Sequence, residues 1–126
     1  MKRFIFLFLL LPSLCFAETI SVMKTDKDNR YDAFDYEDIT VSTASIGLTS
    51  SKYDIDSVRP SVQRVMCYND AQPIRFRLDG TAPTSSVGHQ MNDKDIIILE
   101  GYDNIEDFRA IRQGGTDSTL RCHYFR

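Results

Sequence analysis

The chain contains 126 residues, with a formal net charge of −3 and a hydrophobic fraction of 42%. This is the length of one domain, and a chain of this size buries roughly two-thirds of its unfolded surface, so it can form a core without a metal. The acidic balance and the lack of a basic tail exclude a protein that binds nucleic acid by neutralising phosphates. The composition also excludes a collagen and a multidomain enzyme.

The first 17 residues have the pattern of a secretory signal peptide. Lys2 and Arg3 form a short basic start, residues 4–11 are an unbroken apolar run, and Ala17 ends a cleavage pattern of small residues. The apolar run is shorter than the ~20 residues of a transmembrane helix. We therefore expect an exported protein, periplasmic or extracellular, with no membrane span after signal removal. An uncleaved membrane anchor is the stronger alternative, and a lipoprotein acylated at Cys15 is the weaker one.

Two cysteines remain once the signal is removed. Cys67 and Cys122 form an even pair in an oxidising compartment, which predicts a disulfide. Two cysteines cannot complete a structural zinc site, and His89 and His123 do not have the spacing of a zinc finger. We expect no metal and no cofactor.

The segment after the signal is acidic. Residues 18–56 carry nine acidic against four basic side chains, and the densest part has little apolar material to fold around. Such a composition predicts an extended or mobile acidic arm over residues 18–38. The folded domain is then expected over residues 39–126.

From residue 39 onward, the chain has the two-residue period of β-strands, with turn residues between the apolar segments. The segment 95–100 is a short β-branched apolar run, which predicts a strand buried on both faces. Leu120, Cys122 and Tyr124 share one face of the last strand. The pattern predicts a single Ig-like β-sandwich of about seven short antiparallel strands. The expected strands cover residues 39–41, 45–49, 62–68, 74–78, 95–100, 108–112 and 119–125.

Two strings within this region resemble a known group of proteins. Residues 74–84 read Ile-Arg-Phe-Arg-Leu-Asp-Gly-Thr-Ala-Pro-Thr and are followed by Gly88 and His89; residues 108–115 read Phe-Arg-Ala-Ile-Arg-Gln-Gly-Gly. Over about residues 40–124 the chain resembles small tailed-phage and prophage proteins, which are virion or virion-associated components without known catalytic residues. A weaker similarity is to the chitobiase-type C-terminal β-sandwich domain, a non-catalytic module of secreted glycosidases. The signal peptide and the acidic arm depart from the phage group.

The first string also has a physical interpretation of its own. Asp79 can accept hydrogen bonds from turn amides, Gly80 permits positive φ, and Pro83 fixes φ in the next bend. These residue types are the ones that turns require, so we expect a structural corner rather than a ligand site. The motif comprises Asp79, Gly80, Thr81, Pro83, Thr84, Gly88 and His89.

Five arginines are predicted to point outward from the strands, namely Arg75, Arg77, Arg109, Arg112 and Arg121. If their strands are neighbours, they form a basic patch suited to a carboxylate- or phosphate-bearing partner. We favour the alternative, ion pairs with nearby acids such as Asp79, Glu100 and Asp117. A carbohydrate-binding surface would need exposed aromatic rings. The chain has no tryptophan, and the candidates are Tyr68, Tyr102 and Tyr124, of which the last shares the expected core face.

No catalytic residues are expected. The chain lacks a Gly-x-Ser-x-Gly elbow and a phosphate loop, and adjacent Cys122 and His123 would point to opposite faces of a strand. The first hypothesis is a non-catalytic exported β-sandwich acting through protein contacts, as a phage- or prophage-derived virion-associated or structural accessory protein, with a virion or cell-surface protein as partner. A secreted carbohydrate-binding module is the alternative, and a small secreted enzyme is the third.

Overall fold

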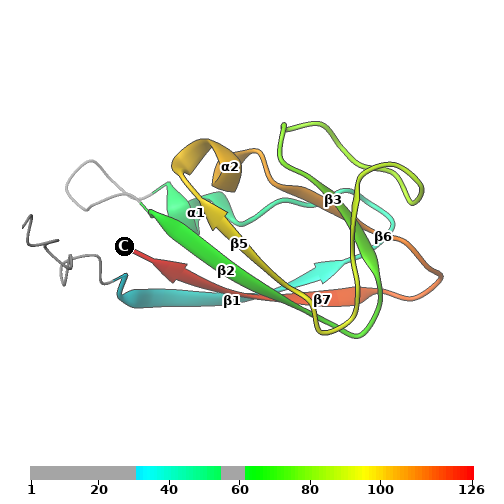
Figure 1. The fold of residues 1–126 in the computed structure, drawn as a ribbon, viewed down its shortest axis with the longest axis horizontal. Helices are drawn as coiled ribbons and strands as arrows, with labels where there is room; N and C mark the ends of the chain where they lie inside the picture. Colours follow the sequence, from blue (N-terminus) through cyan, green and yellow to red (C-terminus); the bar gives the residue numbers. More distant parts are fainter. Residues whose placement is uncertain (1–30, 55–61) are drawn as a thin grey trace, which may run out of the picture.

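Seven strands form two antiparallel sheets in the computed structural model, which describes residues 31–54 and 62–126 (Figure 1). One sheet has four strands in the order β1-β7-β2-β5, and the other has three in the order β4-β3-β6. The all-β sandwich predicted from the alternating pattern is confirmed. The strands are β1 (Ala33–Val41), β2 (Arg64–Asp70), β3 (Ile74–Arg77), β4 (His89–Met91), β5 (Ile96–Glu100), β6 (Arg109–Arg112) and β7 (Ser118–Phe125); the helices are α1 (Ser50–Tyr53) and α2 (Tyr102–Glu106).

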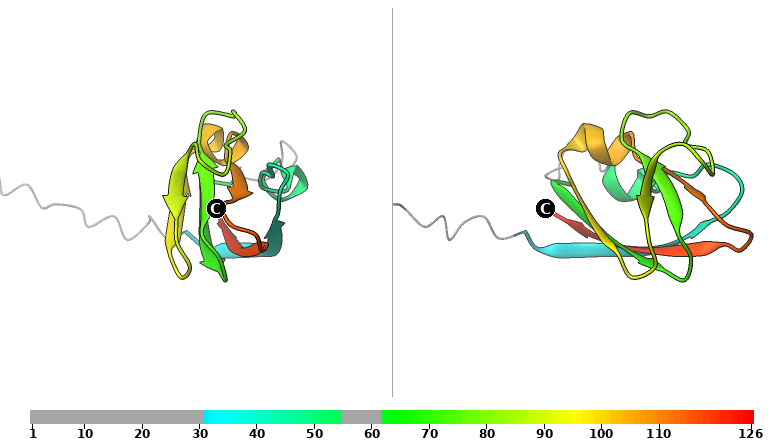
Figure 2. Two further views of the ribbon diagram at one scale, coloured as in Figure 1. Left: turned by 90° about the vertical axis from the view of Figure 1, so that its right-hand side faces the viewer. Right: turned by 45° about the vertical axis from the view of Figure 1, so that its right-hand side comes forward.

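The last strand lies inside the four-stranded sheet. β7 pairs with β1 on one side and with β2 on the other, and Figure 2 shows β1 and β7 running side by side along the molecule. In the immunoglobulin fold, by contrast, the first and the last strand belong to different sheets. The two short helices contact each other at one end of the sandwich (Figure 1). Neither has the length or the apolar character that a membrane-crossing helix needs.

The core lies between the inner faces of the two sheets. Val65, Leu120 and Tyr124 reach it from the four-stranded sheet, and Ile74 and Ala110 reach it from the three-stranded sheet. Each of these residues alternates with a more exposed neighbour along its strand, as expected for a sheet that is buried on one face.

The predicted disulfide is present. Cys67 of β2 and Cys122 of β7 are direct cross-strand neighbours with Cα atoms 4.1 Å apart, and both are fully buried. The bond joins two strands of one sheet, whereas the disulfide of antibody domains joins two sheets. It therefore fixes the register of β7 against β2.

The structure corrects the expected boundary of the acidic arm. Strand β1 begins at Ala33, so residues 33–38 belong to the sheet and not to an arm in front of it. Acidic side chains are unfavourable in a core, but β1 is an edge strand. Asp35 and Glu37 accept hydrogen bonds on one side of it, and Tyr36 and Asp38 face solvent on the other. The signal peptide and the arm up to residue 30 lie outside the described residues.

Two expected strands also differ. Residues 45–49 form no strand and contribute only an isolated bridge, Ile46 to Ala110, because this segment crosses from β1 toward β6. The run 95–100 does form β5, but the prediction of burial on both faces is wrong. Ile96 and Ile98 are 59% and 53% exposed, because β5 lies at the edge of the sheet and these two side chains point away from the core.

Replacing both Cys67 and Cys122 by alanine is expected to lower the free energy of unfolding by about 4 kcal/mol, because the disulfide closes a long loop and restricts the unfolded chain. Urea denaturation of the double variant beside the oxidised protein measures the difference. A loss below about 1 kcal/mol would contradict a stabilising role for this bond.

Candidate functional site

The outer face of the four-stranded sheet carries a row of aromatic and apolar side chains. Tyr36 of β1 lies opposite His123 of β7, His123 opposite Met66 of β2, and Met66 opposite Ile98 of β5. Residues directly opposite each other share a face of the sheet, so these four side chains form one row across all four strands.

A second row runs beside the first. It consists of Asp38, Arg121, Tyr68 and Ile96, again one residue from each strand. We call the eight residues of the two rows the open face, since no described helix or strand lies over them. Tyr36 is 40% exposed, and Ile96 and Ile98 are more than half exposed. Single exposed apolar residues are ordinary, but a contiguous group of them marks an interaction surface.

Polar contacts lie at the end of the open face. Asp70 accepts a 2.6 Å bond from the Lys94 ammonium and a 2.9 Å bond from Arg121. The hydrogen bond from Lys94, with the nearby charge of Arg121, holds the pKa of Asp70 below its ordinary value. The Tyr36 hydroxyl donates to Asp38, and this bond raises the pKa of Tyr36. The apolar row is therefore bordered by groups that already have partners.

The aromatic rings of the open face do not form a flat platform. The rings of Tyr36 and His123 have centroids 4.8 Å apart and planes tilted by 52°. Phe125, the next outward residue of β7, is tilted by 54° against His123. Side chains at such angles do not form one continuous stacking plane.

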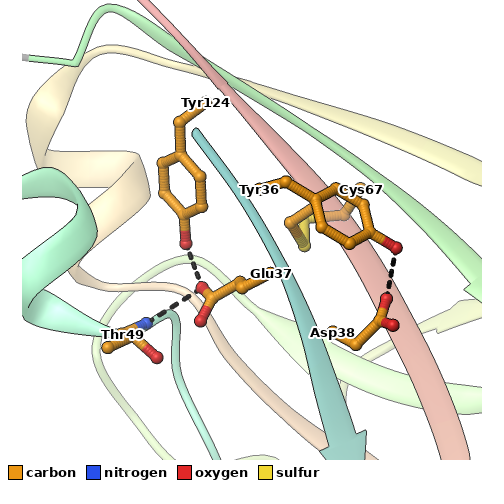
Figure 3. Close-up of a disulfide and its surroundings, with 7 residues drawn as sticks. Tyr36, Glu37, Asp38, Thr49, Cys67 and Tyr124 are labelled. Carbon is orange, nitrogen blue, oxygen red and sulfur yellow. Dashed lines mark hydrogen bonds between the residues drawn. A yellow bond between two sulfur atoms is a disulfide. The ribbon is translucent and has the colours of Figure 1, made fainter. Parts of the chain in front are cut away.

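On the opposite side of β1, two acids hold helix α1. Figure 3 shows Glu37 between Tyr124 and Thr49, while Tyr36 and Asp38 point to the other side of the strand. Glu37 accepts a hydrogen bond from the Tyr124 hydroxyl and a 3.2 Å bond from the Thr49 amide. Asp35 accepts a 2.7 Å bond from Lys52 of α1. These acids are structural, because each is occupied by donors from the fold itself.

The turn motif after β3 makes the contacts of a rigid corner. The Asp79 carboxylate accepts from the Thr81 amide at 3.2 Å and forms a two-point ion pair with Arg77 at 3.0 and 2.5 Å. The hydrogen bond from Arg77 holds the pKa of Asp79 below its usual range. Gly80 has φ of +72°, as its place in the turn requires.

The rest of the motif folds back on the strand. The Thr84 amide and hydroxyl oxygen both bond Val87, and Pro83 is buried. Gly88 and His89 line a surface hollow of about 520 Å³ together with Arg77, Leu78 and Asp79. The two charged groups of this hollow are paired with each other, and the His89 ring lies 5.5 Å from that of Phe76. The motif thus has the contacts that a structural corner needs.

The structure does not bring the five predicted arginines together. Arg75, Arg77 and Arg109 share the outer face of the three-stranded sheet, Arg112 lies on its other face opposite Ile74, and Arg121 lies on the open face. Each has a partner: Arg75 the Gly88 carbonyl, Arg77 Asp79, Arg109 the Glu106 and Phe108 carbonyls, Arg112 Asp117 and Arg121 Asp70. The pairs with Asp79 and Asp117 are two of those expected.

The tyrosines considered for carbohydrate differ in exposure. Tyr124 is buried, Tyr102 packs edge-on against Tyr53 at 6.0 Å, and the half-buried Tyr68 has the Lys94 ammonium 5.6 Å from its ring centre. Among residues 31–54 and 62–126, no three His, Cys, Asp or Glu side chains form a metal-binding group.

Comparison of the chain with protein-family models, with curated proteins and with solved structures finds no match.

Sequence reasoning missed the open face and two buried polar residues, Asn69 and Ser118, which share a 2.7 Å hydrogen bond from the Ser118 hydroxyl to the Asn69 side-chain oxygen. Leu120, Cys122 and Tyr124 were expected to point inward from the last strand, so the alternation of that strand also predicts that His123 points outward. The outward position of Tyr36 could not be predicted, because Glu37 interrupts the apolar pattern of β1. Asn69 is fully buried and binds the carbonyls of Gln72 and Asn92 at 2.8 and 2.9 Å. No pattern in the sequence distinguishes it from a turn asparagine.

Gly88→Ala is expected to destabilise the protein by roughly 2 kcal/mol or more, because φ is +127° and an added Cβ would lie 2.9 Å from the Phe76 carbonyl oxygen. Gly101→Ala is the matched control, with φ of +84° and ψ of 146° but nothing within 4 Å of the added atom, and should cost less than Gly88→Ala, about 1–3 kcal/mol from backbone strain alone. Chemical denaturation compares them. Equal losses would show that the close approach at Gly88 is unimportant.

Alkaline pH is expected to destabilise the fold through Tyr124. Burial, with the hydrogen bond to Glu37, raises the pKa of Tyr124 above that of an unfolded tyrosine, so above about pH 10 the unfolded chain loses a proton that the folded chain retains. The contribution is complete below that pH and is lost as pH rises. Urea midpoints measured against pH should fall more steeply for the native protein than for Tyr124→Phe; parallel curves would contradict this.

Proposed function

We propose that the protein is a non-catalytic, exported β-sandwich that acts through protein contacts, as a phage- or prophage-derived virion-associated or structural accessory protein. The observation that carries the proposal is the open face. Tyr36, His123, Met66 and Ile98 form a row across the whole sheet that is available to a partner.

The composition of the open face fits a protein partner. Aromatic residues and methionine are enriched in protein interfaces, and charged residues are depleted at their centre and gather at the rim. The first row has no carboxylate or ammonium group, whereas Asp38 and Arg121 occupy the second row and Asp70 lies beyond it. A partner that covers both rows buries the apolar row and leaves the existing ion pairs at the edge.

Export and phage descent rest on other features of the chain. Residues 1–17 have the signal-peptide pattern, and a buried disulfide between Cys67 and Cys122 fits an oxidising compartment. The strings that resemble phage proteins fall on β3, its turn and β6, which belong to the three-stranded sheet. The open face lies on the other sheet and is free for a partner.

A carbohydrate-binding module is the second candidate, because Tyr36, His123 and Phe125 place three rings on the outer side of one sheet. Their mutual tilts argue against it, since a sugar ring needs a flat aromatic surface to stack on. Binding to polysaccharides or cell-wall fragments that is lost in Tyr36→Ala would favour this candidate over the first.

The test is association with phage particles released by the strain that carries the gene. Tyr36→Ala combined with His123→Ala should lower the amount of protein in purified particles about tenfold or more, because losing central aromatic contacts costs about 2 kcal/mol or more. Val87→Ala with His89→Ala is the matched control, since it removes an exposed apolar side chain from the bend before β4 and an exposed histidine from β4, away from the four-stranded sheet. Equal amounts of both variants, or no native protein in particles, would contradict the proposal.

A further inference from the structure

The edge of the four-stranded sheet at β5 has the features of a strand that pairs with another strand. We propose that a second copy of this chain adds its own β5 antiparallel to this edge, so that the two four-stranded sheets become one continuous sheet in a two-fold dimer. Ile96, Ile97, Ile98 and Leu99 make up this edge and are all strand-forming or apolar residues.

Backbone groups on the free side of β5 are available for this pairing. Asp95 and Gly101 direct their backbone groups toward β2, with bonds of 3.0 and 3.1 Å to Asn69 and Gln63. Because these directions alternate along an antiparallel strand, the backbone groups of Ile97 and Leu99 also bond β2. The backbone N–H and C=O groups of Ile96 and Ile98 point the other way, toward the free edge of the sheet. Among the described residues, neither of these two isoleucines has a backbone hydrogen bond to any other segment.

The other sheet edges are protected in ways that β5 is not. Strand β1 has a register shift between Ala33 and Asp35 and carries several acids, and β4 has only three residues. The edge of β6 is covered, since Ile46 exchanges bonds of 2.8 and 2.7 Å with Ala110. Charges, bulges, shortness and covering segments are the usual protections of edge strands. Residues 96–99 of β5 have no charge and no proline, and the pairing of β5 with β2 is regular.

The charges at the two ends of β5 make the strand complementary to itself. Lys94, in the turn before the strand, is already paired with Asp70 and Asp93, and Glu100, its last residue, is paired with Arg64. Both side chains nevertheless remain 59% exposed, so each can extend its ion pair to a second copy. With the two-fold axis at Ile97, the outward groups of Ile96 meet those of Ile98 in the second copy, and each Lys94 lies beside the other copy's Glu100. Moving the register by two residues loses this charge pairing. A two-fold axis repeats every contact, so the match occurs twice.

Asn69 keeps β5 in position for this contact. Its side-chain amide donates to the carbonyl of Asn92, and its backbone bonds Lys94 and Asp95. These bonds hold the turn in which Lys94 lies, at the start of the edge strand. The edge is therefore rigid before a second copy binds, which lowers the entropy lost on association.

Sedimentation velocity of the oxidised protein over a range of concentrations tests the proposal. The native protein should pass from monomer to dimer as concentration rises. Ile98→Pro should remain monomeric, because proline removes an outward N–H that β2 does not use. Ile98→Thr is the matched control, since it keeps the N–H and should still dimerise. A native protein that stays monomeric at every concentration, or a folded Ile98→Pro protein that dimerises like the native one, would overturn the proposal.

Cross-linking tests the register without relying on the folding of the proline variant. Ile96→Cys and Ile98→Cys proteins, mixed and oxidised, should form covalent dimers much faster than either protein alone, because residues 96 and 98 face each other only across two copies. Circular dichroism checks that each variant is folded. Equal rates in the mixture and in the separate proteins would overturn the proposed pairing. These measurements concern the free protein, so their failure leaves the particle-association test unaffected.

Discussion

The position of β7 between β1 and β2 is the constraint on which the rest of the structure depends. This strand holds β1 through its pairing along one side and is joined to β2 by hydrogen bonds and by the Cys67–Cys122 disulfide along the other. Its inward residues complete the core, and its outward residues place His123 and Arg121 in the two rows of the open face. A change in the register of β7 by one residue would exchange these two faces.

The same arrangement explains why one sheet face is open and the other is not. The inner faces of both sheets bury the apolar residues of the core, and the arginines on the outer face of the three-stranded sheet are bonded to acids or backbone carbonyls of the same chain, such as Arg77 to Asp79. The outer face of the four-stranded sheet instead exposes Ile96, Ile98 and Tyr36. Tyr36 lies on one edge strand and the two isoleucines on the other, and His123 and Met66 complete the row between them. An apolar row of this kind is a cost in a protein that acts alone, which is why we connect it with a partner.

Much of the fold could be predicted from local pattern. The alternation of apolar and charged residues at 74–78 and the inward set of the last strand led to the correct strands, and the cysteine count led to the disulfide. The start of β1 was missed, because Asp35 and Glu37 point toward helix α1 and only tertiary contacts to Lys52 and Thr49 explain acids at those positions. Burial of the run 95–100 was overestimated, because an apolar strand at a sheet edge has the same composition as one at the centre. The site was harder still, since each row of the open face draws one residue from each of four strands and its members are distant in sequence.

Side-chain footprinting with hydroxyl radicals tests the central claim, which is that the open face is the surface of contact with a partner. The protein is oxidised once free in solution and once within purified particles, and the modified residues are located by mass spectrometry. The account predicts that Tyr36, Met66 and His123 lose reactivity in particles, while His89 and Val87 on the other side of the sandwich keep theirs. Protection confined to His89 and Val87, with Tyr36 and His123 unchanged, would contradict it.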